Sequence, residues 1–359
     1  TFQYNLKLGI SMIQSGESLI SFVGAAESGI VPEIYEAFAA TRGLAEDKNL
    51  IKLQEQLGED YEIPNHRKIC RPFGENIGMI LGESAQFIVL MQDSLALELG
   101  LNIHGAALSS HIHSDGYKKS ISGPGAGNYL TVGKIFNEIK KHFSSDALNK
   151  TFFHAHGTST PQNRESESHI ISSISKAFGI KALPVTAIKS YLGHSLAAAG
   201  GDQMISTLGS WKNNLIPGIT STPELAKNVH KENVEFLLQN KKIGNGEFDF
   251  AVLNAKGFGG NNGTSLVSSP SKTMQMLKSK YSKKDIDAYL IKKSKIDDQL
   301  EKTKQEILKG DITSRYIFGE NVIDGMNDFD IETDKITNKF NQEVFDLNST
   351  LPYKDYLKS

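Results

Sequence analysis

The feature that most constrains this chain is a set of three short apolar runs, each of which ends in a tight turn of small residues. The turns contain His156-Gly157-Thr158-Ser159-Thr160-Pro161, then Gly193-His194, and then Gly257-Phe258-Gly259-Gly260. The runs before them have the length of buried strands, and α/β folds present reactive groups where such strands end. Three turns of this kind predict one shared pocket.

Strand-like and helix-like segments alternate in the second part of the chain. The predicted strands are 151–155, 183–188, 249–255 and 263–268, and the predicted helices are 165–178 and 195–211. Earlier segments predict a helix that opens the chain, strands at 18–26, within 78–90 and at 103–109, and helices within 32–57, at 94–99 and at 128–142. Alternation of this kind predicts a layered α/β fold with helices on both faces of the strands.

Composition narrows the class of protein. The chain has 359 residues, 39% hydrophobic and 22% charged, which is enough apolar sequence for a substantial core. The formal net charge of -2 gives no global attraction to nucleic acid or to an anionic membrane. The sequence has no apolar run of about 18 residues, so it predicts no membrane span. Because Cys70 is the only cysteine, no intrachain disulfide can form, which fits a reducing compartment such as the cytoplasm.

Two histidines in glycine-bearing turns are candidates for acid–base work or for hydrogen bonds to a developing oxyanion. These are His156 and His194, and Lys189 lies just before the second. A packed imidazole or a zinc ligand would be the alternative, but no further ligand recurs at metal spacing, and His154 is expected on the opposite face of its strand. The glycine-rich segment 123–127 lacks the lysine of a phosphate loop and is interpreted as a turn before a helix.

Together these stretches resemble the β-ketoacyl-acyl-carrier-protein synthases, which are condensing enzymes of fatty-acid and polyketide synthesis. The matching residues are His156 to Pro161, Lys189 to His194, Gly200-Gly201 and Asn254 to Asn262. Two further stretches, Arg71-Pro72-Phe73 through Gly82-Glu83 and Ser120 to Gly125, are similar to longer bacterial members. The resemblance implies a thiolase-like fold of α-β-α-β-α layers. It divides the chain into the remainder of an N-terminal half with a connecting segment (1–150), a C-terminal half (151–269) and a helical C-terminal extension (270–359).

The resemblance also implies a reaction, the decarboxylating Claisen condensation of an acyl thioester with malonyl-acyl-carrier protein. His156 and His194 would hydrogen-bond the thioester oxygen that becomes an enolate during decarboxylation. Lys189 would set the local electrostatics and orient His156, with Glu167 as its partner. No cofactor and no metal are implied.

A third group of residues is expected to serve the condensation step. The backbone amide of Phe258, between Gly257 and Gly259, would bind the tetrahedral oxyanion, and the Phe258 ring would gate the pocket. The glycine-rich turn taken alone would be only a turn. Lys256 stands where relatives have an apolar or aromatic residue, and Asn261 stands in place of threonine.

The nucleophile of the family has no counterpart among these motifs. Its cysteine would lie just upstream of Thr1, at the start of the opening helix, where the helix dipole lowers the pKa of a thiol. Cys70 does not match that motif and is expected to be a structural thiol. Arg164 stands where relatives carry an acidic residue.

Two functions remain open at this point. The chain is part of an acyl-condensing enzyme, or it is a non-catalytic partner resembling a chain-length factor. Retention of His156, His194 and Lys189 favours the enzyme, and a non-decarboxylating thiolase is disfavoured because thiolases use a late second cysteine. The implied partners are malonyl- and acyl-loaded acyl-carrier protein, acyl-CoA and a second copy of the chain, with Lys118 and Lys119 as candidate carrier contacts.

Overall fold

The computed structural model describes residues 2–118, 123–311, 319 and 322–348, and for Phe258 it describes the backbone alone. Two compact units are present, Thr1–Asp297 and Asp298–Ser359. Lys119 and residues 120–122, which carried two of the sequence predictions, lie outside the described residues. The predicted divisions at 150 and 269 stay predictions.

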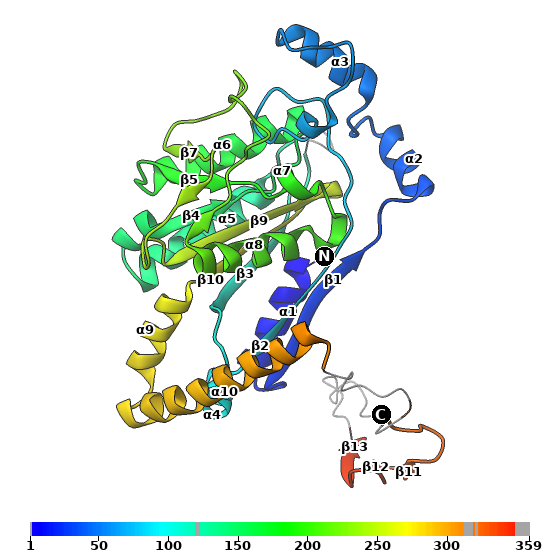
Figure 1. The fold of residues 1–359 in the computed structure, drawn as a ribbon, viewed down its shortest axis with the longest axis vertical. Helices are drawn as coiled ribbons and strands as arrows, with labels where there is room; N and C mark the ends of the chain where they lie inside the picture. Colours follow the sequence, from blue (N-terminus) through cyan, green and yellow to red (C-terminus); the bar gives the residue numbers. More distant parts are fainter. Residues whose placement is uncertain (1, 119–122, 312–318, 320–321, 349–359) are drawn as a thin grey trace, which may run out of the picture. The chain divides into compact units, whose positions relative to one another are not determined.

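A six-stranded mixed sheet is the centre of the first unit (Figure 1). Its order is β3 (Ala106–Ser114), β10 (Asn261–Ser268), β9 (Phe250–Gly257), β4 (Thr151–His154), β5 (Leu183–Thr186) and β7 (Val234–Phe236). The strands β9, β4, β5 and β7 run parallel, whereas β10 is antiparallel to both of its neighbours. Parallel strands end at the same edge, so this order brings the predicted strand-end turns together.

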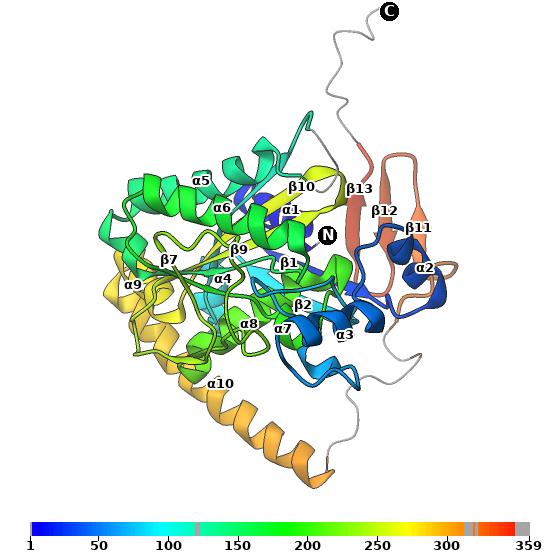
Figure 2. The ribbon, with the colours of Figure 1, turned by 90° about the horizontal axis from the view of Figure 1, so that it is seen from above.

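Helices cover both faces of this sheet, as the sequence predicts. Figure 2 shows α5 (Ala126–His142) and α6 (Pro161–Ala177) along one face and α8 (Ala199–Asn213) along the other, where α1 (Phe2–Gln14) also packs. Consecutive strand residues point to opposite faces: Phe153 packs into the core beneath α5 and α6, and Phe152 into the core beneath α1 and α8. Both phenylalanine side chains are fully buried.

A second, two-stranded sheet lies on the far side of α1 and α8. It pairs β1 (Ile20–Glu27) with β2 (Ser84–Met91) in antiparallel register. Val23 of β1 is buried in the same core as α1, while Phe22 and Phe87 on the other face are exposed. The first unit therefore has alternating α, β, α and β layers.

The close approach of α1 to α8 depends on glycine. A Cβ built on Gly201 would lie 2.5 Å from the Cβ of Gln86, and one on Gly200 would lie 3.3 Å from the Cβ of Phe2. Contacts under 3.0 Å require the neighbour to move, so the small-residue start of α8 is what lets α1 and β2 pack against it.

The remaining elements of the first unit connect or extend these layers. They are α2 (Pro32–Ala40), α3 (Asp47–Gln56), α4 (Asp93–Leu99), α7 (Lys189–Leu192), β6 (Leu215–Ile216), β8 (Lys241–Lys242) and α9 (Pro270–Lys280). The predicted helical region 32–57 is two helices, because the chain turns at Arg42 with a positive φ of 55°. The helix predicted from 165 begins earlier, at Pro161, because Thr160 caps it by accepting the Asn163 N–H.

The first part of the predicted helical extension forms two helices, α9 and α10 (Lys283–Lys309). The second unit contains an antiparallel meander of β11 (Phe329–Ile331), β12 (Lys335–Asn338) and β13 (Glu343–Asp346). The prediction of a helical extension over 270–359 is therefore wrong for this part, where short runs with β-branched and aromatic residues form strands. None of the helices in the described ranges is long and apolar enough to cross a membrane.

Candidate active site

The turn after β4 places His156 at the floor of a cavity. Gly157 adopts a positive φ of 50°, and a Cβ there would lie 2.6 Å from the Cβ of Ala187, so only glycine fits. The Glu167 carboxylate fixes the turn by accepting hydrogen bonds from the backbone N–H of His156 (2.8 Å) and of Gly157 (2.9 Å). The direction of the His156 side chain is therefore set by a buried carboxylate on α6.

Glu167 is fully buried, and its carboxylate accepts four hydrogen bonds. Besides the two backbone groups, the side-chain amides of Asn163 (2.9 Å) and Asn254 (2.7 Å) donate to it. These four hydrogen bonds use both carboxylate oxygens, and within the described residues no ion pair involves the carboxylate.

Lys189 begins α7 and is 3% exposed. Among the described residues, its Nζ has no hydrogen-bond partner. Burial lowers the pKa of Lys189 to about 8, while the charges of Glu167, Asp202 and Cys70 act in the opposite direction. The Glu167 charge thus acts on Lys189 without a hydrogen bond between the two side chains. The carboxylate binds the His156 turn and does not form the direct pair with Lys189 that the sequence suggested.

His194 lies in the turn after α7, next to a positive-φ glycine, Gly193. Its backbone N–H donates to the Ile80 carbonyl (2.8 Å), and its Nδ1 accepts the Leu196 N–H (3.0 Å). An accepting Nδ1 places the proton of the neutral ring on Nε2, which leaves an N–H donor for the cavity.

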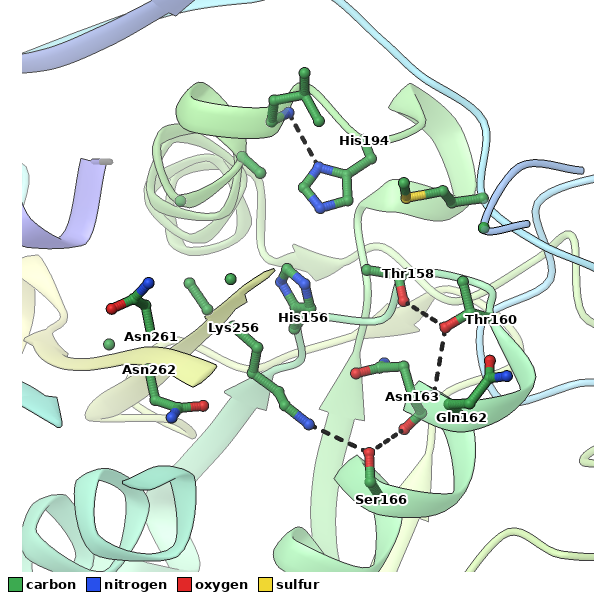
Figure 3. A pocket seen from close by; sticks show the side chains of 18 of the residues that line it. His156, Thr158, Thr160, Gln162, Asn163, Ser166, His194, Lys256, Asn261 and Asn262 are labelled. Carbon is green, nitrogen blue, oxygen red and sulfur yellow. Dashed lines mark hydrogen bonds between the residues drawn. The ribbon is translucent and has the colours of Figure 1, made fainter. Parts of the chain in front are cut away.

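The two imidazoles face each other across the cavity (Figure 3). Their ring centroids are 5.2 Å apart and their planes are nearly perpendicular at 83°. Burial first, and the Lys189 charge second, hold the pKa of both His156 and His194 well below the usual histidine range. Both rings are therefore neutral near pH 7, and each can donate one hydrogen bond.

The cavity has a volume of about 480 Å³ and is lined by segments that are distant from one another in the sequence. It extends from the start of α1 at Phe2, past the histidines, to the loop before α3 at Arg42 and the start of α6 at Thr160. Gly257 also lines it, and Phe258 and Gly259 follow in a one-turn 3₁₀ segment. This brings the third predicted turn to the same cavity, and the oxyanion role of the Phe258 amide stays a prediction.

Polar side chains form much of the cavity wall. The hydroxyl oxygens of Thr158 and Thr160 are hydrogen-bonded at 3.1 Å, and the Lys256 ammonium donates to the Ser166 hydroxyl at 3.2 Å. Lys118, a candidate carrier contact, is instead largely buried at this wall and forms a 2.8 Å ion pair with Asp115.

Cys70 lies outside the cavity. It is buried and donates its thiol hydrogen to the Lys189 carbonyl at 3.0 Å. Burial raises the pKa of Cys70 to about 12. A thiol with this pKa is a poor nucleophile, in agreement with the expectation of a structural role.

Several supporting residues escaped the sequence analysis. Gln203 in α8 donates to the carbonyls of Ala155 and Asn254, both at 2.8 Å, and so ties β4 to β9 directly beneath the site. The backbone N–H of Arg71 donates to the Ser159 hydroxyl at 2.7 Å and braces the turn from outside. The only sequence signal for these supporting residues was a polar residue within an otherwise apolar or small-residue segment.

Comparison with known proteins agrees with this geometry. Residues 105–222 match the model of the β-ketoacyl synthase C-terminal domain. The chain is 41% identical over 329 residues to the β-ketoacyl-acyl-carrier-protein synthase FabY of Pseudomonas aeruginosa, covering 90% of this chain and 50% of FabY. It is 25% identical over 259 residues to a 3-oxoacyl-acyl-carrier-protein synthase 2 of Staphylococcus aureus, covering 70% and 56% of the two chains.

Solved structures show the same relationship. The crystal structure of FabY superposes with a TM-score of 0.88 at 38% identity, over 99% of this chain and 55% of that chain. A β-ketoacyl synthase from Burkholderia phymatum, at 20% identity and a TM-score of 0.58 over 75% and 59% of the chains, shares the fold. The fold is thus the thiolase-like α/β fold of ketosynthases, and the chain belongs to the β-ketoacyl synthase family. It spans about half the length of the curated relatives that it matches.

Proposed function

We propose that this chain carries the decarboxylation site of a β-ketoacyl-acyl-carrier-protein synthase and serves fatty-acid biosynthesis. The observation that supports it most is the pair of buried, neutral imidazoles of His156 and His194 in one cavity. Two neutral N–H groups suit an oxygen that gains negative charge. Because neutral imidazole is a very weak acid, these groups stabilise an enolate without protonating its carbon.

In the first step, the thioester oxygen of a malonyl unit accepts hydrogen bonds from both histidines. The bond between the α-carbon and the carboxylate breaks, carbon dioxide leaves, and the electron pair becomes an enolate held by the two N–H groups. The Lys189 charge behind the rings favours their neutral state, which keeps the donors in the form the step requires.

Before the condensation, a cysteine thiolate takes the acyl group from its carrier, and the carrier thiol leaves. In the second step, the enolate carbon attacks the resulting acyl–cysteine thioester. A carbon–carbon bond forms, the tetrahedral oxyanion collapses, and the thiolate leaves as the β-ketoacyl product departs on its carrier. The cavity reaches α1 at Phe2, so a cysteine at the N-terminal end of α1 would face both imidazoles and gain from the helix dipole. We propose this position for the nucleophile and the Phe258 amide as an oxyanion donor.

The proposed partners follow from the reaction. The names of the relatives specify an acyl-carrier protein, and we propose malonyl- and acyl-loaded carrier as the substrates, with acyl-CoA as a possible acyl source. We also propose a homodimer, as the family resemblance implies, and a cytoplasmic location, because a chain with a single cysteine fits a reducing compartment.

Product analysis tests the proposal. The protein, with the preceding segment that would carry the nucleophile, is incubated with butyryl-carrier and malonyl-carrier, and carbon dioxide and carrier-bound products are measured by mass spectrometry. The synthase predicts a β-ketoacyl-carrier and one carbon dioxide per condensation. A non-catalytic partner resembling a chain-length factor would produce neither, and that result would contradict the proposal.

A further inference from the structure

Lys256 is a cation in the wall of the cavity that the two-histidine chemistry does not use. It lies near the end of β9, opposite Asn262 in the β9–β10 register, and is partly buried. Figure 3 shows its side chain passing beside His156 and reaching toward Ser166. Apolar residues such as Phe2, Met79 and Leu196 line other parts of the same cavity.

The ammonium group of Lys256 has few partners. It donates one hydrogen bond, to the Ser166 hydroxyl at 3.2 Å. Over the part of the chain that the structure describes, no carboxylate forms an ion pair with it. An ammonium has three donors, so this group retains hydrogen-bonding capacity directed at the cavity.

The acidic groups near Lys256 already accept hydrogen bonds from other residues. Glu167 has its four donors, none of which is Lys256. Asp115 accepts from Lys118 at 2.8 Å and from the Asn262 side chain at 2.8 Å. The Lys256 charge is therefore better matched by an anionic group entering the cavity than by either protein carboxylate.

We propose that Lys256 binds the free carboxylate of the malonyl unit and so makes this cavity selective for a dicarboxylic thioester over a simple acyl thioester. The inference rests on the proposed function. The two thioesters differ in this carboxylate, and a cation beside the two histidines is positioned to distinguish them. Because the carboxylate leaves as neutral carbon dioxide, its ion pair with Lys256 stabilises the bound substrate more than the transition state. Loss of the ion pair should therefore weaken binding and raise KM and kcat together, with little change in kcat/KM.

Binding of stable analogues to the full chain tests this without a turnover assay. The probes are the malonyl and butyryl amides of pantetheine, in which nitrogen replaces the thioester sulfur, measured by calorimetry. Loss of one charge-assisted contact in Lys256→Met should weaken the malonyl probe by about tenfold or more and leave the butyryl probe within about twofold. Lys256→Arg should retain the preference, and Lys256→Gln is a second neutral variant in case the methionine variant does not fold.

Lys118→Met is the matched control, because it removes a cation of the same cavity that already has a carboxylate partner. It should not change the ratio of the two affinities. Equal weakening of both probes in the neutral Lys256 variants, or no weakening, would overturn the inference and leave the proposed function standing. If the unaltered chain binds neither probe, the proposed function fails together with the inference.

Discussion

The Glu167 carboxylate gives the sharpest prediction about how the site is held. In Glu167→Gln the side chain keeps its length, but one acceptor oxygen becomes an NH₂ group. That group would face two of the four donors that now surround the carboxylate. Because the residue is fully buried, water cannot replace the lost acceptor.

Two buried donors without an acceptor cost about 2 kcal/mol each, so the expected loss in the free energy of unfolding is about 4 kcal/mol. Urea unfolding can be followed by the fluorescence of Trp211, the only tryptophan. Glu165→Gln is the control, since Glu165 lies on the same helix, is exposed and accepts one hydrogen bond, from Asn228. A loss below about 1 kcal/mol for Glu167→Gln, relative to the control, would refute the assignment of Glu167 as the anchor of the turn.

Three further predictions concern titratable groups. Cys70, with a pKa of about 12, should resist iodoacetamide in the folded protein at pH 8 and react once after unfolding, as a mass shift would show; rapid native labelling would contradict its burial. Burial lowers the pKa of His154 to about 3 and lowers those of His156 and His194, so the unfolded chain binds more protons below the ordinary histidine pKa of 6.5. The contribution of these three histidines to the free energy of unfolding is therefore complete above about pH 6.5 and falls as the pH drops toward 3. A free energy of unfolding that rises on acidification from pH 7 to 5 would be inconsistent with this prediction. Lys189→Met should raise the pKa of both active-site imidazoles in an NMR titration, while Lys189→Arg should not; unchanged values in the methionine variant would exclude an electrostatic role for Lys189.

Much of the fold could be predicted because its signals are local. Apolar periodicity gives the faces of α1 and α5, and the strand-end turns of β4 and β9 carry glycines that few other structures require. Parallel strands bring such turns to one edge, so a shared cavity for His156 and His194 followed from the order of the elements. The short strands β6, β7 and β8 have at most three residues each, too few to give a period in the sequence.

The supporting contacts of the site could not be predicted in the same way. A carboxylate on α6 could have paired with Lys189 or capped the turn, and only the position of α6 against β4 decides for the turn. Cys70 meets Lys189 across 119 residues, a contact that no local pattern signals. The lack of an ion pair at Lys256, within the residues described, is likewise a property of the packed cavity.

The most direct test of the central claim is the rate of carbon dioxide release from a malonyl thioester by the His156→Ala and His194→Ala variants. Each variant loses one donor to the enolate oxygen, which should slow release by about 10²–10³-fold, or about 3 kcal/mol. His169→Ala removes an exposed histidine that hydrogen-bonds Tyr129 away from the cavity, and it should leave the rate unchanged. If either active-site variant releases carbon dioxide as fast as the His169→Ala control, the two imidazoles are not the enolate-stabilising pair.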